Sequence, residues 1–207
     1  MSKIRILIVE DEPAIAEHIA AYFDNPDFMV SGIAYDQEEA MEQLKDNTPD
    51  AAILDINLGT EGDGIRIAEE LNSKYHLPFL FLTAHADKQT LERAKGVNPG
   101  GYIVKPFNEK TLQASMEIAI SNHARELNLV LPPPVIEKIN KHLLSPLSER
   151  EFEIAVLINE GLTNNQLAEK LFLSVNTIKS HLKSIYLKLD ATSRYGVIIR
   201  LRQLMSK

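Results

Sequence analysis

Carboxylates follow two apolar runs of this sequence, at the point where each run ends. Glu10 and Asp11 come directly after Ile4–Val9, and Asp55 is the last residue of Ala51–Asp55. Aspartate is uncommon in strands and seldom buried without a partner, although it often begins a turn. Acids packed together raise one another's pKa, and a hard divalent cation such as Mg²⁺ relieves that repulsion. The pattern therefore indicates either a simple turn at Asp55 or a magnesium site.

Two more polar residues stand at the ends of later apolar runs. Thr83 ends Pro78–Thr83, and Lys105 follows Gly101–Val104. With Asp55 as nucleophile an acyl phosphate could form, while Mg²⁺ and the Lys105 ammonium neutralise the transferring phosphoryl oxygens. Thr83 could donate a hydrogen bond to the attached group. Each residue alone has an ordinary structural explanation, but their shared position favours phosphoryl chemistry.

The elements that must position these residues form an alternating pattern. The predicted strands are Ile4–Val9, Phe28–Ala34, Ala51–Asp55, Pro78–Thr83 and Gly101–Val104. The predicted helices are Glu12–Phe23, Gln37–Lys45, Gly64–Lys74, Asp87–Lys95 and Glu109–Leu127. Strands alternating with helices predict an α/β fold, a five-stranded parallel doubly wound sheet. Since ligands of such sheets bind outside the carboxyl ends of the strands, we expect the polar residues to meet there.

Charge divides the chain into two parts. Residues 145–207 hold nine Lys and Arg against six Asp and Glu, whereas the rest holds 13 against 23. An acidic front and a basic tail suggest different partners, and only the tail favours nucleic acid on electrostatic grounds. We therefore expect a first domain over residues 1–127, a proline-interrupted linker over 128–144 with one short helix at most, and a second domain over 145–207.

Composition also indicates the cellular compartment in which the protein works. The chain has no cysteine, which excludes disulfides and thiolate chemistry and fits a reducing cytoplasm. No apolar run approaches the ~18 residues of a membrane-spanning helix, and acids interrupt the first segment at once. We expect a cytoplasmic protein with no membrane partner.

The tail predicts an all-α unit of four helices. Capping boxes are predicted at Ser148 with Glu151 and at Thr163 with Gln166, and Gly161 is expected to close the first helix. The third helix has an apolar stripe at 3-4-3-4 spacing: Val175, Ile178, Leu182, Ile185 and Leu189. Its opposite face carries Asn176, Lys179, Ser180 and Lys183. A tight turn followed by a basic polar helix suits entry into the major groove, but a protein-binding helical domain fits the periodicity equally well.

Residues 3–123 resemble a response-regulator receiver domain of two-component signalling. The resemblance is carried by ILIVEDE, AILDINLG, FLTA and YIVKPF, in that order. It implies a flavodoxin-like and CheY-like fold in which a partner histidine kinase phosphorylates Asp55. The implied Mg²⁺ ligands are Asp11, Asp55 and the backbone carbonyl of Asn57, with Glu10 acting through water.

The same resemblance assigns roles around the phosphoryl group. Lys105 would pair with it, and Ala84 would leave it room to enter. Thr83 and Tyr102 would form a switch pair, in which Thr83 moves toward the phosphoryl group and the Tyr102 ring turns inward. One segment, GVNPGGYIVKP, is longer than the usual GAxxY pattern, so we expect the helix before the last strand to end early, with a recast loop at 98–100.

Residues 145–207 are similar to the LuxR-type helix-turn-helix of the NarL/FixJ response regulators. The similarity is carried by SEREFEIAVLINEGLTNNQLAEKLFLSVNTIKSHLKSIYLKL. It implies contacts with double-stranded DNA by these residues: Asn176, Lys179, Ser180 and Lys183 in the groove, and Thr177 and Lys188 at phosphate. His181 could reach the DNA backbone or pack at the edge of the core. The last helix, Tyr195–Met205, would supply the contact of an active homodimer on a two-fold site.

The combined resemblance implies a transcription regulator that is not an enzyme, apart from Mg²⁺-dependent phosphorylation and dephosphorylation of its own aspartate. Two alternatives stay open. Haloacid-dehalogenase-like phosphatases also use an aspartate nucleophile, Mg²⁺, threonine and lysine, but usually carry Asp-x-Asp after the first strand, whereas Glu10 and Asp11 are adjacent. The second is a regulator that works without phosphorylation, or whose tail binds protein.

Overall fold

The computed structural model describes residues 3–47, 49–59, 63–84, 88–130 and 133–205. The chain separates into two compact units, of which one spans Arg5–His123 and the other contains Ala124–Lys207. Each unit has its own core and is described by itself. Within the described ranges, no helix is both long enough and apolar enough to cross a membrane.

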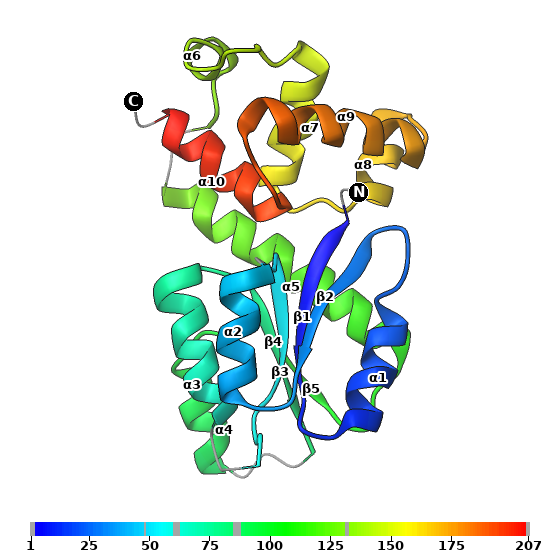
Figure 1. The fold of residues 1–207 in the computed structure, drawn as a ribbon, viewed down its shortest axis with the longest axis vertical. Helices are drawn as coiled ribbons and strands as arrows, with labels where there is room; N and C mark the ends of the chain where they lie inside the picture. Colours follow the sequence, from blue (N-terminus) through cyan, green and yellow to red (C-terminus); the bar gives the residue numbers. More distant parts are fainter. Residues whose placement is uncertain (1–2, 48, 60–62, 85–87, 131–132, 206–207) are drawn as a thin grey trace. The chain divides into compact units, whose positions relative to one another are not determined.

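The first unit is built on a parallel sheet, which in the described part of the chain has five strands in the order β2-β1-β3-β4-β5. The strands are β1 Ile4–Val9, β2 Phe28–Ala34, β3 Ala51–Asp55, β4 Phe79–Thr83 and β5 Gly101–Val104 (Figure 1). Four of the strands have the predicted bounds, and β4 begins one residue later than predicted. Every side chain of β3 and β4 is buried, as expected for parallel strands covered on both faces.

The register of the strands brings their polar ends to one edge. Val9 of β1 pairs with Leu54 of β3, so Glu10 follows beside Asp55. Asp55 in turn pairs with Leu82 of β4, and Thr83 pairs with Val104 of β5. The predicted meeting of polar residues at the carboxyl edge is thus present in the fold.

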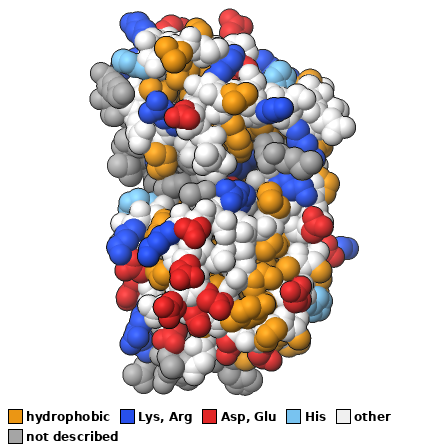
Figure 2. Space-filling view, in the orientation of Figure 1, with side chains coloured by type: hydrophobic (Ala, Val, Ile, Leu, Met, Phe, Trp, Pro, Cys, Tyr) orange, Lys and Arg blue, Asp and Glu red, His pale blue; other side chains and the backbone are white. Residues whose placement is uncertain are grey.

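Helices cover the sheet, and α2 and α3 lie on one side of it while α1 lies on the other (Figure 1). Their bounds are α1 Pro13–Tyr22, α2 Gln37–Asn47, α3 Asp63–Glu70, η1 Leu71–Tyr75, α4 Lys88–Lys95 and α5 Glu109–Val130. The predicted helix bounds lie close to the observed ones. Two differences are that the last turn of the third helix is a π-helix and that α5 runs three residues beyond Leu127. Asp87, predicted to begin the fourth helix, lies outside the described residues. Acidic side chains gather over α2 on the face shown in Figure 2.

The loop between α4 and β5 is recast as the sequence predicted. Helix α4 ends at Lys95, and Asn98 takes a left-handed conformation with φ of 48°. The Gly100 amide then donates to the Phe79 carbonyl at 2.9 Å, which extends the strand pairing. A Cβ at Gly100 would lie 2.4 Å from the Cβ of Ala119, so only glycine lets the loop pack this closely on α5.

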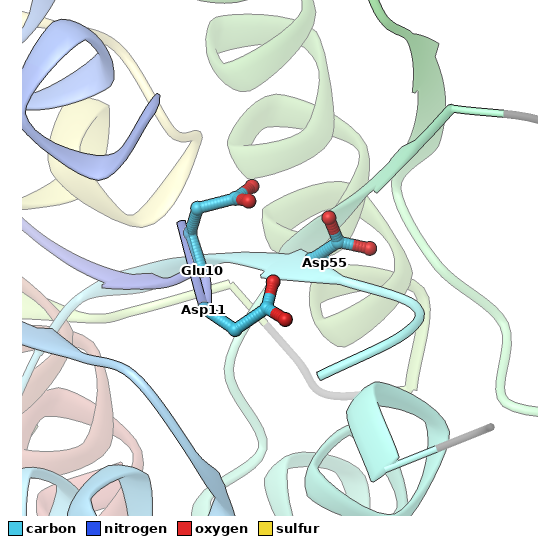
Figure 3. A group of neighbouring side chains, drawn as sticks. All are labelled: Glu10, Asp11 and Asp55. Atoms are coloured by element: carbon cyan, nitrogen blue, oxygen red, sulfur yellow. The ribbon is translucent and has the colours of Figure 1, made fainter. Parts of the chain in front are cut away.

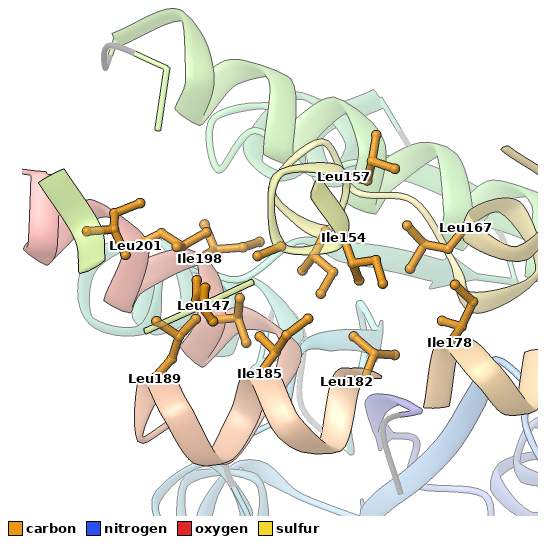
Figure 4. Packing of buried hydrophobic residues seen from close by; sticks show 14 of the residues in the cluster. Leu147, Ile154, Leu157, Leu167, Ile178, Leu182, Ile185, Leu189, Ile198 and Leu201 are labelled. Carbon is orange, nitrogen blue, oxygen red and sulfur yellow. The ribbon is translucent and has the colours of Figure 1, made fainter. Parts of the chain in front are cut away.

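The second unit is helical and contains α6 Ile136–Asn140, α7 Glu149–Asn159, α8 Asn164–Leu171, α9 Val175–Leu189 and α10 Arg194–Met205. Both predicted capping boxes are present, at Ser148 with Glu151 and at Thr163 with Gln166. Gly161 follows α7 with φ of 84°, as a closing glycine should. Buried leucines and isoleucines from α7, α8, α9 and α10 form the core, with the apolar stripe of α9 facing inward (Figure 4).

The segment predicted as a linker contains one short helix, α6, as the sequence allowed, but this helix packs on the second unit. Its first residues belong to α5, and helix α6 packs against the core of the second unit through Ile139, which is fully buried. The Asn140 side chain accepts from the Leu147 amide at 2.8 Å and donates to its carbonyl at 3.0 Å. Ile139 is a buried apolar side chain in an otherwise polar helix, and its packing makes α6 part of the second unit.

We expect Ile139→Ala to destabilise the second unit by on the order of 3 kcal/mol, because it removes a fully buried side chain from the core. Hydrogen–deuterium exchange of the α7 and α9 amides measures the change. Glu137→Ala, on the exposed side of α6, is the control and should leave exchange nearly unchanged. Equal protection in both variants would show that α6 does not belong to this core.

Candidate functional site

Three carboxylates converge at the carboxyl edge of the sheet. Glu10 and Asp11 follow β1 and Asp55 ends β3, and one carboxylate oxygen of each lies within 4.8 Å of the others (Figure 3). Glu10 is 0% exposed and Asp55 6% exposed, whereas Asp11 faces solvent. A half-enclosed set of oxygen donors of this kind suits a hard divalent cation. The sequence therefore predicted correctly that these three residues meet.

Lys105 closes the cluster from the end of β5. Its Nζ donates to Asp55 Oδ2 at 2.5 Å and to Glu10 Oε1 at 2.8 Å. Burial alone would lower the pKa of the Lys105 ammonium, but the hydrogen bonds to the two carboxylates outweigh it and raise that pKa. Lys105 is therefore held in its charged form, where it compensates the buried negative charge.

Glu10 has an unusual protonation equilibrium. Burial raises the pKa of its carboxyl group to about 7, with the charge of Asp55 adding to the rise and the hydrogen bond from Lys105 opposing it. Such a shift reflects the crowding of acids in a desolvated place. Strongly perturbed groups of this kind are common at functional sites.

The backbone holds Asp55 in place from two directions. The Asn57 amide donates to Asp55 Oδ1 at 2.9 Å, so the turn after β3 fixes the carboxylate. Gly64, at the start of α3, donates its amide to the Ile56 carbonyl at 3.2 Å. A Cβ on Gly64 would lie 1.9 Å from the Asp55 carbonyl oxygen, so glycine alone allows α3 to begin here. Sequence reasoning missed Gly64, although its place directly after the turn could have drawn attention to it.

Thr83 and Tyr102 present hydroxyl groups with free hydrogen-bonding capacity. Thr83 is 3% exposed, and its Oγ1 has no hydrogen-bond partner among the described residues. The Tyr102 ring stacks on Phe81 with centroids 5.9 Å apart, and its hydroxyl is likewise buried and unpartnered within the described ranges. Burial also raises the pKa of the Tyr102 hydroxyl. Buried hydroxyls normally find a partner, so the Thr83 hydroxyl, at the carboxyl end of β4, is available to a group that enters the site. The charges that act on the Tyr102 hydroxyl are those of Lys95 and Glu92 on α4.

The second unit presents the predicted polar face of α9. Asn176, Ser180 and Lys183 are exposed, and Thr177, Lys179 and His181 are half-buried. Ser174 caps the helix by accepting from the Thr177 amide at 3.0 Å. A groove of about 560 Å³ runs along the helix and is lined by Lys179, Ser180, Lys183, Tyr186, Leu187, Asp190 and Ala191. The groove has a largely apolar lining, but Lys179 and Lys183 beside it can contact a nucleic-acid backbone.

Lys188 differs from the expectation of a phosphate contact. Its Nζ lies 2.7 Å from Glu151 Oε2 and 2.9 Å from the carbonyl oxygen of Pro146, so it is engaged inside the protein. Burial would raise the pKa of Glu151, but hydrogen bonds from Lys188, Ser184 and Ser148 hold it at about 2. The sequence identified Glu151 only as a capping residue, because nothing in helical periodicity reveals a contact between two helices.

Comparison with known proteins identifies both units. A family model described as the response regulator receiver domain matches residues 6–117, more than half of the chain. A second, described as the luxR family of bacterial regulatory proteins, matches residues 145–201. The transcriptional regulatory protein LnrK of Bacillus subtilis is 28% identical, with 95% of this chain and 99% of LnrK covered. LiaR of the same organism is 27% identical, with 92% and 93% covered.

A solved structure supports the fold of the first unit. The signal receiver domain of a modulated diguanylate cyclase from Desulfovibrio desulfuricans matches with a TM-score of 0.56 and 36% identity. The match covers 60% of this chain and 99% of that domain. The similarity is thus confined to the first unit of this chain.

The first unit carries a cluster of carboxylates and a lysine at the edge of a parallel sheet, and the second unit matches a helix-turn-helix family. Together these two units define a signalling protein with an input and an output domain. The chain belongs to the response regulator family, with a LuxR-type DNA-binding domain at its carboxyl end. It is a transcription regulator of a two-component system, and the matches indicate a regulator and not a catalytic enzyme.

We expect Gly64→Ala to lower the free energy of unfolding by on the order of 2 kcal/mol, because the added methyl group must displace the backbone at Asp55. Thermal unfolding of the full chain measures the loss. Gly196→Ala in α10 is the matched control: its nearest neighbour is 3.4 Å away, and alanine is the better helix former. An equal melting temperature for Gly64→Ala and the unaltered chain would contradict the close approach.

Proposed function

We propose that a partner histidine kinase phosphorylates Asp55 and that this change controls DNA binding by the second unit. The observation that carries the proposal is the Asp55 carboxylate itself, buried at the end of β3 with the Lys105 ammonium 2.5 Å away. Exposed carboxylates of the chain also pair with lysines, but those pairs stand in water, whereas Asp55 and Lys105 are largely buried. The family to which the chain belongs supports the same conclusion.

In the proposed transfer, a carboxylate oxygen of Asp55 attacks the phosphorus of a phosphohistidine. The P–O bond forms as the P–N bond breaks, and the electron pair leaves with the imidazole nitrogen. The Lys105 ammonium stabilises the negative charge of the phosphoryl oxygens, and the unpartnered Thr83 hydroxyl donates to one of them. The switch then involves Thr83 and Tyr102, which shift an existing equilibrium between two states.

The carboxylate cluster fits Mg²⁺ by the chemistry of its donors. Asp11, Asp55 and the Asn57 carbonyl would bind the ion directly, and Glu10 would act through water. The proximity of the three carboxylates supports this set. Bound Mg²⁺ would supply further neutralisation of the phosphoryl oxygens. Hydrolysis of the Asp55 acyl phosphate at the same site would return the chain to its resting form.

For the output we propose that α9 enters the major groove of double-stranded DNA. Lys179, Ser180, Lys183 and Asn176 would contact the groove, and Thr177 would contact phosphate. The exposure of the central polar residues of α9 supports this orientation. We further propose that residues 1–127 act as receiver and 145–207 as DNA-binding domain, joined by 128–144. The active form would be a cytoplasmic homodimer on a two-fold DNA site, with α10 supplying the contact between the two subunits.

We expect Asp55→Asn to abolish acid-labile phosphate incorporation from acetyl phosphate in the presence of Mg²⁺, because an amide cannot form an acyl phosphate. Labelling of the intact chain measures it. Asp46→Asn, on the exposed face of α2, is the control and should label fully. Retained label in the Asp55 variant would sink the assignment, whereas equal loss in both variants would indicate a folding defect.

The double variant Lys179→Ala with Lys183→Ala should bind DNA more weakly and with a shallower salt dependence, because fewer counterions are released from phosphate. Fluorescence anisotropy at several salt concentrations gives the slope. Lys141→Ala, an exposed lysine outside α9, serves as the control. An unchanged slope in the double variant would place the DNA surface elsewhere.

A further inference from the structure

The Glu151 carboxylate is 6% exposed and makes more contacts than its helix requires. As the third residue of α7 it accepts from the Ser148 amide at 2.8 Å, which completes the capping box. Its Oε1 also accepts from the Ser184 hydroxyl at 2.5 Å, and its Oε2 from Lys188 Nζ at 2.7 Å. One buried carboxylate thus caps α7 and binds α9.

These contacts reach α9 on two consecutive turns. Ser184 and Lys188 are four residues apart, so their side chains lie on the same side of the helix. That side is the flank between the buried stripe, which includes Leu182 and Ile185, and the exposed face that carries Ser180 and Lys183. The buried stripe sets which face of α9 points inward. Directed hydrogen bonds along the flank add a second constraint on the rotation of the helix about its axis.

Lys188 adds a third attachment. Besides pairing with Glu151, its ammonium donates to the Pro146 carbonyl at 2.9 Å. The next residue, Leu147, is held through its backbone by the Asn140 side chain of α6. Through Lys188, helix α9 is therefore bonded both to α7 and to the segment that follows α6.

We infer that Glu151 and Lys188 are positioning residues for DNA recognition, which set the rotation of α9 so that its polar face meets the base edges, without contacting DNA themselves. The inference rests on the proposed docking of α9 in the major groove. It assigns Lys188 a different role from Lys179 and Lys183, although all three are cations on one helix.

Two substitutions distinguish a positioning role from a direct electrostatic effect on DNA affinity. Lys188→Met removes a cation and Glu151→Gln removes an anion, so their direct electrostatic effects on DNA affinity have opposite signs. If both residues act by orienting α9, both substitutions lower the affinity. Glutamine can still accept from the Ser148 amide, so the capping box is preserved and α7 is retained.

The probe is a 30-base-pair duplex (about three helical turns) selected from a random pool by the full unaltered chain, both with Mg²⁺ alone and with Mg²⁺ and beryllofluoride. A scrambled duplex of equal composition is measured beside it under the same conditions. We expect Lys188→Met and Glu151→Gln each to lose about 10-fold in affinity for the selected duplex and little for the scrambled one. The salt slope should stay unchanged in both. The double variant should lose no more than either single variant, and Lys188→Arg should restore much of the binding.

A fall in affinity for both duplexes with a slope about 0.9 shallower in Lys188→Met would show a phosphate contact and overturn the inference. Tighter binding by Glu151→Gln would overturn it too. Circular dichroism at the assay temperature confirms that the variants are folded, and Lys188→Arg supplies the comparison if Lys188→Met is not. Failure of the unaltered chain to enrich any duplex would instead overturn the proposed DNA binding, and the inference with it.

Discussion

The first unit depends on a compensated charge at the end of a buried strand. Asp55 and Glu10 are removed from water by an apolar sheet, which would be costly without a partner. The ammonium of Lys105 supplies that partner from the end of β5, which is two positions from β3 and three from β1 in the sheet. Parallel topology makes this possible, because it delivers residues that are 50 and 95 positions apart in sequence to one edge. One ammonium compensates only part of the charge of three carboxylates, so the cluster still favours a divalent cation.

The second unit also contains a buried carboxylate paired with a lysine, but in different surroundings. Glu151 is buried and paired with Lys188, but its neighbours are a helix cap and the flank of α9, with no acidic cluster beside it. The contact organises helices and leaves the polar face of α9 open to solvent. We propose different roles for these two clusters of buried charges: the first would react with a phosphoryl donor, and the second would hold α9 in position. Their surroundings distinguish them: crowded acids in the first case, and complete hydrogen bonding in the second.

Much of this arrangement could be predicted from sequence because its signals are local. Apolar runs located the strands, and the polar residue at or just after the end of a run located Glu10, Asp55 and Lys105. Capping boxes at Ser148 and Thr163 followed from residues three positions apart. Contacts between distant elements left no such signal. The pairing of Lys188 with Glu151, the close approach of Gly64 to Asp55, and the packing of α6 through Ile139 depend on tertiary structure, and each was missed or misassigned for that reason.

The central claim is that chemistry at Asp55 governs DNA binding by α9. The most direct test is the affinity of the full chain for its in vitro selected duplex, measured with Mg²⁺ before and after addition of beryllofluoride, a mimic of the phosphoryl group. We expect the affinity to change on addition in the unaltered chain and to stay constant in Lys105→Met, which lacks the compensating ammonium. An affinity that does not respond in the unaltered chain, although beryllofluoride is bound, would contradict the claim that the two units communicate through this site.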